Sequence, residues 1–172
     1  MGGRDQALGV LDRGARGAQR ALLLRMWSDD VTLLADGPAE LDAADLHRLR
    51  DAGVTVDERG VAELRGPEGS LTAVAFANGE ERPLGGLLVP VTLYQRSGLP
   101  KELGAAATAR GQVAFDPVEV DQMHHTTAPG LFAAGDVMAQ MPSVANSVAA
   151  GSSAAAMVVH SLMAEAHDLT PA

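Results

Sequence analysis

The chain has 172 residues, of which 47% are hydrophobic and only 3% aromatic, so one domain or two small ones must build their cores from Leu, Val, Ala and Met. The net charge of −9 argues against a nucleic-acid partner, which would require a basic surface. The sequence contains no cysteine, and this excludes disulfides, thiolate metal sites and thiol redox chemistry in this chain.

The first third of the chain alternates between helical periodicity and short apolar runs. Such an order is typical of a parallel α/β unit. The expected elements are a helix over residues 5–27 capped by Asp5, a buried strand over 31–34, a helix over 42–52 and a strand over 54–56.

The opening residues are rich in glycine, as is the turn that joins the first strand to the first helix of a dinucleotide-binding unit. No hydrophobic strand is expected before this turn, so Gly2, Gly3 and Asp5 are interpreted as the remnant of a nucleotide loop or as a flexible terminus. Asp36 ends the second strand, where an acid can bind an adenosine ribose. Its position before a Gly-Pro pair favours the alternative of a plain turn residue.

Residues 58–93 change to short apolar runs that alternate in part, with a hairpin signal at Asn78-Gly79. This pattern predicts an antiparallel β-meander attached to the α/β unit. The expected strands cover residues 61–64, 71–76 and 87–93, and a short helix over 100–103 and a strand over 113–115 follow.

The last part of the chain is centred on the apolar run Leu131 to Ala134, which is followed by Gly135-Asp136 and predicts a short buried strand. Gly135 has no Cβ and lets a ligand approach, and the Asp136 carboxylate can accept hydrogen bonds from a sugar-like hydroxyl. A helix of small residues is expected over 143–165, and its free N–H groups suit an electron-rich ligand edge.

The segment Thr126 to Val137, TTAPGLFAAGDV, resembles the C-terminal flavin-binding segment of the thioredoxin-reductase-like flavoproteins, with its hallmark T-x-x-PGLFAAGD-V. The resemblance implies that Asp136 binds the FAD ribityl chain and that the following helix start faces the pyrimidine end of the flavin ring. The implied cofactor-binding residues are Gly135, Asp136, Val137, Ala145 and Asn146, with Gly2, Gly3 and Asp5 as remnants of a nicotinamide-nucleotide loop.

The implied fold class is α/β. An incomplete Rossmann-like nucleotide-binding unit with an antiparallel β-meander is expected over residues 1–93, followed by the C-terminal segment of an FAD-binding domain over 94–172. Three family features are not found in the sequence: the N-terminal strand with the GxGxxG turn that cradles the FAD pyrophosphate, the first strand of the nucleotide domain, and the CxxC pair.

We therefore expect one subunit of a split FAD-dependent oxidoreductase, acting on a small molecule and using NAD(P)H as a further cofactor. A second polypeptide, or a second copy of the chain, would supply the missing half and share the FAD. The alternatives are a non-catalytic partner that completes another flavoprotein's fold, or a fragment of a longer protein.

Other chemistry finds little support in the sequence. His124-His125 are adjacent, point to opposite faces of an extended segment and are interpreted as structural. No metal-ligand spacing occurs, so no metal site is expected. No run of about 18 apolar residues is present, so no membrane helix is expected and the predicted location is the cytoplasm.

Overall fold

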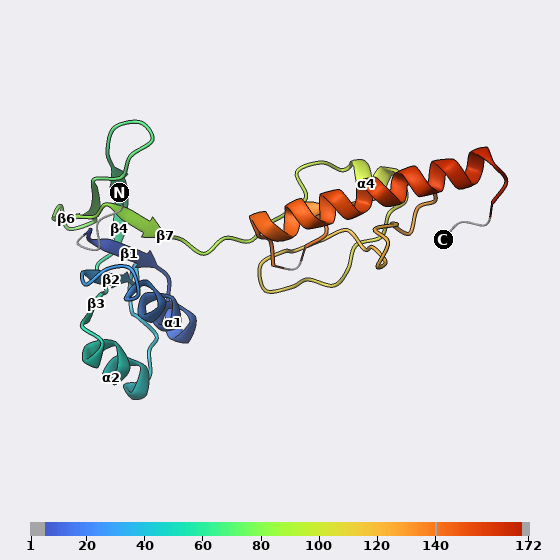
Figure 1. Ribbon diagram of the computed structural model, residues 1–172. Helices are drawn as coiled ribbons and strands as arrows, with labels where there is room; N and C mark the ends of the chain where they lie inside the picture. The colour runs from blue at the N-terminus through green and yellow to red at the C-terminus, as the bar shows by residue number, and fades with distance from the viewer. Residues whose placement is uncertain (1–5, 140, 170–172) are drawn as a thin grey trace. The chain divides into compact units, whose positions relative to one another are not determined.

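The protein is described by a computed structural model that covers residues 6–139 and 141–169 (Figure 1). It divides into two compact units between Pro90 and Val91. Each unit has its own architecture, and the predicted elements are best compared with the observed ones unit by unit.

The first unit contains a parallel sheet flanked by two helices (Figure 1). The strand order is β3-β2-β1-β7, and all three pairings are parallel. Its elements are β1 (Leu8–Leu11), α1 (Gly14–Leu24), β2 (Val31–Leu34), α2 (Ala43–Asp51), β3 (Val54–Asp57) and β7 (Gly86–Leu88). The parallel α/β pattern predicted for this region is confirmed.

Strand β1 shows that two predictions are wrong: residues 5–27 do not form one long helix, and the first strand of the nucleotide-binding unit is not missing. The run Leu8–Leu11 pairs with β2 on one side and β7 on the other, so it is a central strand of the sheet. A Cβ on Gly9 would lie 2.8 Å from side-chain carbons of Leu84 and Leu87, so the glycine allows close packing there. A short apolar run next to a helix has no periodicity of its own, so the sequence alone predicts that the helix includes it.

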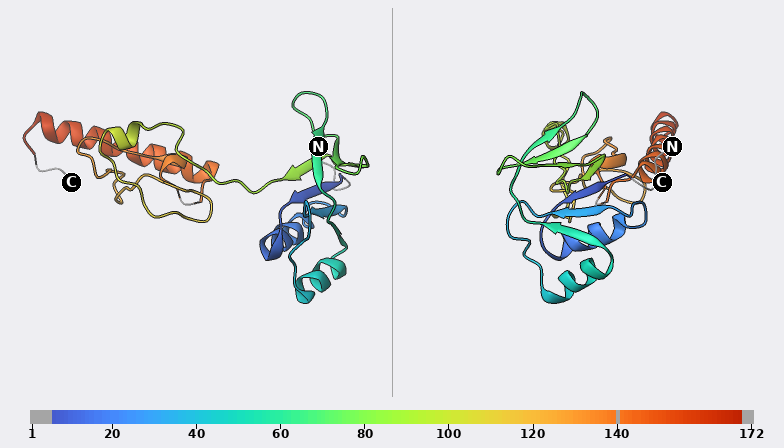
Figure 2. Two further views of the ribbon diagram at one scale, coloured as in Figure 1. Left: turned by 180° about the vertical axis from the view of Figure 1, so that it is seen from behind. Right: turned by 90° about the vertical axis from the view of Figure 1, so that its left-hand side faces the viewer.

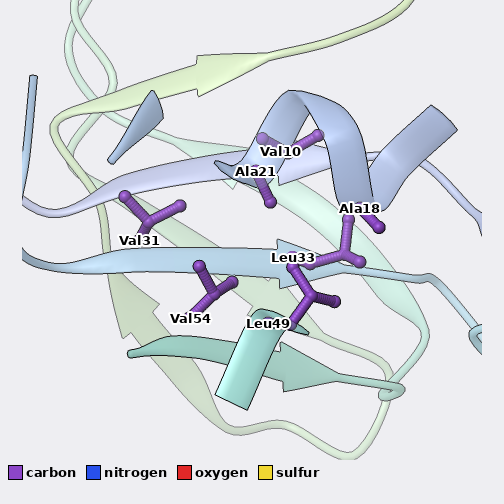
Figure 3. Close-up of a cluster of buried hydrophobic side chains, with 7 residues drawn as sticks. All are labelled: Val10, Ala18, Ala21, Val31, Leu33, Leu49 and Val54. Atoms are coloured by element: carbon purple, nitrogen blue, oxygen red, sulfur yellow. The ribbon is translucent and has the colours of Figure 1, made fainter. Parts of the chain in front are cut away.

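One face of the sheet packs against both helices (Figure 3). Val10 of β1 and Leu33 of β2 are fully buried under Ala18 and Ala21 of α1, and Leu49 of α2 completes the cluster. Small side chains on α1 let its backbone approach the strands closely. Helix α2 is capped by Asp42, whose side chain accepts a hydrogen bond from the Asp45 N–H at 2.7 Å.

The opposite face is covered by a three-stranded antiparallel sheet of β4 (Val61–Arg65), β5 (Ala73–Phe76) and β6 (Glu81–Pro83) (Figure 2). Val74 and Phe76 pack with Leu34 of β2 and with Leu84 in a second core cluster. The predicted meander is thus present. The strand expected over 87–93 is wrong as placed: β7 covers Gly86–Leu88 and joins the parallel sheet beside β1.

The second unit has little regular structure before its final helix. It contains α3 (Leu99–Glu102), the 3₁₀ turn η1 (Gly135–Val137) and α4 (Val144–Ala166). The strands predicted over 113–115 and 131–134 are not formed. Ala114 makes a single bridge with Leu93, and Phe132 a single bridge with His125. An isolated bridge pairs only one residue and leaves the other N–H and C=O groups of the segment without strand partners. The residues Leu131 to Ala134 are also only half-buried, whereas the sequence predicts a buried strand.

Helix α4 is the longest element of the described chain (Figure 1). Ser143 caps it, because its side chain accepts a hydrogen bond from the Asn146 N–H at 3.2 Å. By length and mean hydropathy alone α4 could cross a membrane, contrary to the expectation from apolar runs, and only 11% of its most apolar window is buried. A core helix meets the same test, so this finding is weak evidence for a membrane protein.

Candidate functional site

The turn η1 presents the acidic residue that the sequence singles out. Ala134 is extended, with φ −148° and ψ 160°, and Gly135 then adopts a positive φ of 79° that reverses the chain. A Cβ at Gly135 would lie 3.8 Å from the Ser147 side chain, which is an ordinary contact. Backbone conformation, rather than lack of space, is therefore the reason for glycine at this position.

The Asp136 side chain is exposed and held at one oxygen. Its Oδ1 accepts a hydrogen bond from the Ser147 hydroxyl at 2.7 Å. Ser147 lies one turn into α4, four residues after the capping Ser143. This contact ties the carboxylate to the start of the helix and leaves Oδ2 as the oxygen for a further donor.

Three cavities meet around this turn. One of about 370 Å³ is lined by Gly135, Asn146 and Ser147 together with Met138, Ala139, Met141 and Ala150. A second, of about 580 Å³, is lined by Asp136, Pro142, Ser143, Val144, Ser147 and Val148. A third, of about 280 Å³, has Asp136 and Val137 in its wall. A ligand could therefore reach the Asp136 carboxylate from two cavities.

The start of α4 adds an electropositive surface beside the turn. Ser143 uses its side chain for the Asn146 N–H and its carbonyl for the Ser147 N–H. Val144 and Ala145 precede the point where N–H groups find intrahelical acceptors, so their amides carry the positive end of the helix dipole. The turn with Gly135, Asp136 and Val137 lies next to the start of α4. Ala145 and Asn146 are both exposed on the first turn of that helix, and Asn146 lines a cavity together with Gly135.

Two residues of this site have no role in the flavin-binding motif of the sequence. Ser147 is one of several serines in a helix of small residues, but four residues after the cap it lies on the same side of the helix as Ser143. Gln95 donates from its side-chain amide to the Val137 carbonyl at 2.7 Å. No local pattern predicts that contact, because 42 residues separate the two positions.

The histidine pair lies in a loop before the turn, and the side chain of His125 is held by local contacts. The His125 Nδ1 is 3.0 Å from Asp121 Oδ2, and the His125 ring contacts Phe132 in a tilted arrangement with ring centroids 4.6 Å apart. Partial burial raises the pKa of the Asp121 carboxyl, but hydrogen bonds from the His125 and Met123 backbone and from the His125 ring outweigh it, and the net pKa is lowered. These contacts stabilise the loop conformation.

Asp36, the acid of the first unit that could bind an adenosine ribose, is already engaged by protein groups. Gly2, Gly3 and Asp5 lie outside the described residues. The two glycines of this region instead lie in the first turn of α1, at Gly14 and Gly17. Asp12, between β1 and α1, pairs through its carboxylate with Arg20.

Arg13 connects this turn to the end of β2. Its Nε donates to the Ala35 carbonyl at 2.6 Å, and its guanidinium lies 3.6 Å from the Asp36 carboxylate. Asp36 has a positive φ of 49°, and its Oδ1 accepts a hydrogen bond from the Val61 N–H at 2.8 Å. Asp36 therefore acts as a turn residue that is already paired.

The part of the chain that the structure describes contains no cluster of side chains that could bind a metal ion. Residues 6–139 and 141–169 contain no group of three or more His, Asp or Glu side chains placed to hold an ion. The polar groups around η1 are the Asp136 and Asp116 carboxylates, the Gln95 amide, hydroxyls and helix amides. This set suits a neutral or electron-rich organic ligand.

Comparison with known proteins places the chain in a well-populated fold. Residues 14–151 match the pyridine nucleotide-disulphide oxidoreductase family. An oxidoreductase from Agrobacterium tumefaciens is 30% identical, with a TM-score of 0.77 over 92% of this chain and 52% of that one. The protein HlmI is 32% identical, with a TM-score of 0.74 over 95% of this chain and 50% of that one.

A thioredoxin reductase from Streptococcus pyogenes has the same fold, with a TM-score of 0.72 at 22% identity over 94% of this chain and 54% of that one. No curated protein matches the chain. The chain spans about half the length of the structures that it matches. The resemblance to thioredoxin-reductase-like flavoproteins and the predicted α/β fold class are confirmed.

Proposed function

The chain belongs to the pyridine nucleotide-disulphide oxidoreductase family, and on that premise we propose that it forms half of an FAD-dependent oxidoreductase. The family is one of FAD- and NAD(P)-dependent enzymes, so a flavin is the expected cofactor. In this proposal Asp136 holds the ribityl hydroxyls of FAD, Gly135 and Val137 line the flavin, and the first turn of α4 with Ala145 and Asn146 faces the ring.

The observation that supports the proposal most is the exposed carboxylate of Asp136 beside the start of α4. Its Oδ1 is fixed by Ser147 at 2.7 Å, and two cavities open onto it. A carboxylate that is fixed but still accessible can accept a hydrogen bond from a ligand hydroxyl without reorganising. The residues present thus fit the sugar-like chain of a flavin, and the helix amides fit its electron-rich ring edge.

The residue types indicate which part of the reaction belongs to the cofactor and which to the protein. FAD, when bound, supplies the electron-transfer chemistry. Asp136 orients the cofactor, and the amides of α4 favour negative charge near the ring. Because the sequence has no cysteine, the electrons would pass to a small-molecule substrate, to oxygen or to another carrier rather than to a disulfide of this chain.

We further propose that a second polypeptide, or a second copy of the chain, completes the cofactor site in the cytoplasm. The chain spans about half of its structural relatives. Helix α4 exposes apolar side chains at helical spacing, with Val148, Val159 and Leu162 between 60% and 68% exposed. An exposed apolar stripe of this kind is typical of a surface that another segment covers.

Purification from the native source, with whatever travels with the full chain, tests the proposal. We expect a complex with the visible absorbance of flavin and FAD in a fixed ratio to the chain. A chain that remains a colourless monomer and is unaffected by added FAD would contradict both the cofactor and the partner.

The exposed stripe of α4 also favours a second candidate, a non-catalytic partner that completes the fold of another flavoprotein. The two candidates differ in where the cofactor is held. If the complex keeps its full FAD content after Asp136→Ala, the flavin is held by the partner alone and the binding role is favoured. Loss of FAD from the same complex favours the enzyme half.

A further inference from the structure

Gln95 occupies a position between two segments of the second unit that lie far apart in sequence. Leu93 bonds with the 113–115 segment in both directions, since the Leu93 N–H donates to the Val113 carbonyl and the Phe115 N–H to the Leu93 carbonyl, each at 2.8 Å. Two residues later the Gln95 N–H donates to Asp116 Oδ1 at 3.0 Å. These contacts hold the backbone of Gln95 in place independently of its side chain.

The side-chain amide of Gln95 then contacts two carbonyl groups. Its Nε2 donates to the Asp116 carbonyl at 3.2 Å and to the Val137 carbonyl at 2.7 Å. A primary amide nitrogen has two hydrogens, and both are used here. The Val137 carbonyl also accepts from the Val118 N–H at 2.9 Å, so both of its lone pairs are engaged.

Val137 is the last residue of η1 and directly follows Asp136. The turn is thus held at two successive residues: Ser147 donates to the Asp136 carboxylate, while Gln95 and Val118 donate to the Val137 carbonyl. Gln95 and Asp136 also share the wall of the cavity of about 280 Å³. A shift of the Val137 peptide would move the neighbouring carboxylate relative to that cavity.

We propose that Gln95 is a positioning residue for the flavin-binding turn, which sets the direction of Asp136 through the Val137 carbonyl. The inference rests on the proposed FAD site. It adds a residue 41 positions before Asp136 in the sequence, in a segment that no motif marks. Gln95 need not touch the cofactor, because its effect passes through the turn.

The decisive variant is Gln95→Glu, which keeps the side-chain shape and replaces the donating NH₂ by an oxygen. At neutral pH the introduced carboxylate faces two carbonyl oxygens and is repelled, so the turn loses its anchor. We expect the Kd for FAD to rise about tenfold, as for the loss of a hydrogen bond with a partner left unsatisfied. Gln112→Glu is the matched control, because Gln112 is an exposed glutamine of the same unit.

A pH profile separates positioning from general damage. When the introduced carboxyl group is protonated it regains one donor, which can serve the Val137 carbonyl. The ratio of the variant's Kd to the wild-type Kd should therefore fall as the pH is lowered from about 8 towards about 5, nearer the carboxyl pKa. A ratio that stays constant over this range would overturn the proposal.

Amide hydrogen exchange of the FAD-free chain gives a readout that does not depend on the cofactor. Exchange of the Val118 amide, which shares the Val137 carbonyl, should accelerate in Gln95→Glu and not in Gln112→Glu. If Gln95→Glu does not fold, Gln95→Met removes the donor without adding charge, and the same acceleration is expected.

The outcomes are distinguishable. If Val118 exchange accelerates while the Kd for FAD is unchanged, the positioning role is wrong and the FAD site stands. If the exchange of the Val118 amide is unchanged, Gln95 does not hold the Val137 carbonyl, and the proposal is wrong. If the wild-type chain or its complex takes up no FAD, the proposed function fails, and the role of Gln95 toward a flavin fails with it.

Discussion

The hydroxyl of Ser147 donates to Oδ1 of Asp136 at 2.7 Å and so joins the 3₁₀ turn η1 to the first turns of α4. The contact spans 11 residues and leaves the carboxylate exposed beside two cavities. A donor at this position selects one orientation of the Asp136 side chain. The orientation in which Asp136 can accept a hydrogen bond from a ligand hydroxyl thus depends on Ser147 of α4 as well as on the turn η1.

Removing that hydroxyl should weaken cofactor binding without unfolding the unit. In Ser147→Ala we expect the Kd for FAD to rise about threefold to tenfold, since a hydrogen bond to a charged group is lost at a partly exposed site. Isothermal titration of the flavin-free protein with FAD measures the change. Ser152→Ala, at an exposed serine one turn further along α4, is the control and should leave the Kd unchanged.

Gly135 should tolerate no side chain, for a conformational reason. Its φ of 79° lies in the left-handed region, so Gly135→Ala is expected to destabilise the second unit by about 1–2 kcal/mol. Denaturant unfolding measures this loss. Gly151→Ala is the matched comparison: it lies within α4 with open space around it, and alanine there should stabilise the helix by about 0.5–1 kcal/mol. Equal effects at the two glycines would contradict the conformational explanation.

The first unit should lose stability in acid through Asp57. Hydrogen bonds from the Arg59 guanidinium lower the pKa of Asp57, although burial opposes the shift. The folded pKa of Asp57 lies below the unfolded pKa of about 3.9. The stabilisation is therefore complete above the unfolded pKa and is lost as the pH falls through the folded pKa.

Asp57→Asn should therefore reduce the dependence of unfolding free energy on pH in this acid range. The measurement is a series of denaturant melts between neutral pH and acid. Glu68→Gln, at an exposed carboxyl of the same unit, should reproduce the wild-type slope. An Asp57→Asn protein with an unchanged acid slope would show that the Arg59 contact does not stabilise the fold.

The exposed stripe of α4 should control association with the partner. Val159 is 64% exposed, so Val159→Lys should leave the isolated chain folded and sharply reduce the amount of partner that co-purifies with it. Ser153→Lys adds the same charge at an exposed residue about 120° around the helix from Val159 and should retain the partner. Loss of the partner in both variants, or in neither, would contradict an interface centred on this stripe.

Much of the fold could be predicted from sequence because local signals were strong. The apolar run Val31–Leu34 reads as a buried strand, and Ser143 marks the start of α4. Strand β1 was missed because Leu8–Leu11 is short, lies next to a helix, and becomes a strand only through its pairing with β2 and β7. Tertiary pairing of this kind leaves no periodic trace in so few residues.

In the candidate site, too, some residues could be predicted from a local sequence motif and others could not. Gly135 and Asp136 belong to a contiguous motif and could be found from the sequence alone. The contact of Gln95 with Val137 could not, because it depends on how a loop of more than 40 residues folds back on itself. The failure of Leu131–Ala134 to form a strand has a related cause: within the described residues Phe132 pairs only with His125.

The central claim, that this chain holds FAD through the Asp136 carboxylate, is tested most directly by the FAD content of the purified protein or complex after Asp136→Ala. Glu119→Ala, which removes an exposed acid elsewhere in the same unit, is the control. We predict that Asp136→Ala loses most of its FAD, with its visible flavin absorbance, while Glu119→Ala keeps the wild-type amount. Full FAD content in Asp136→Ala, with the chain folded and its partner retained, would contradict the account.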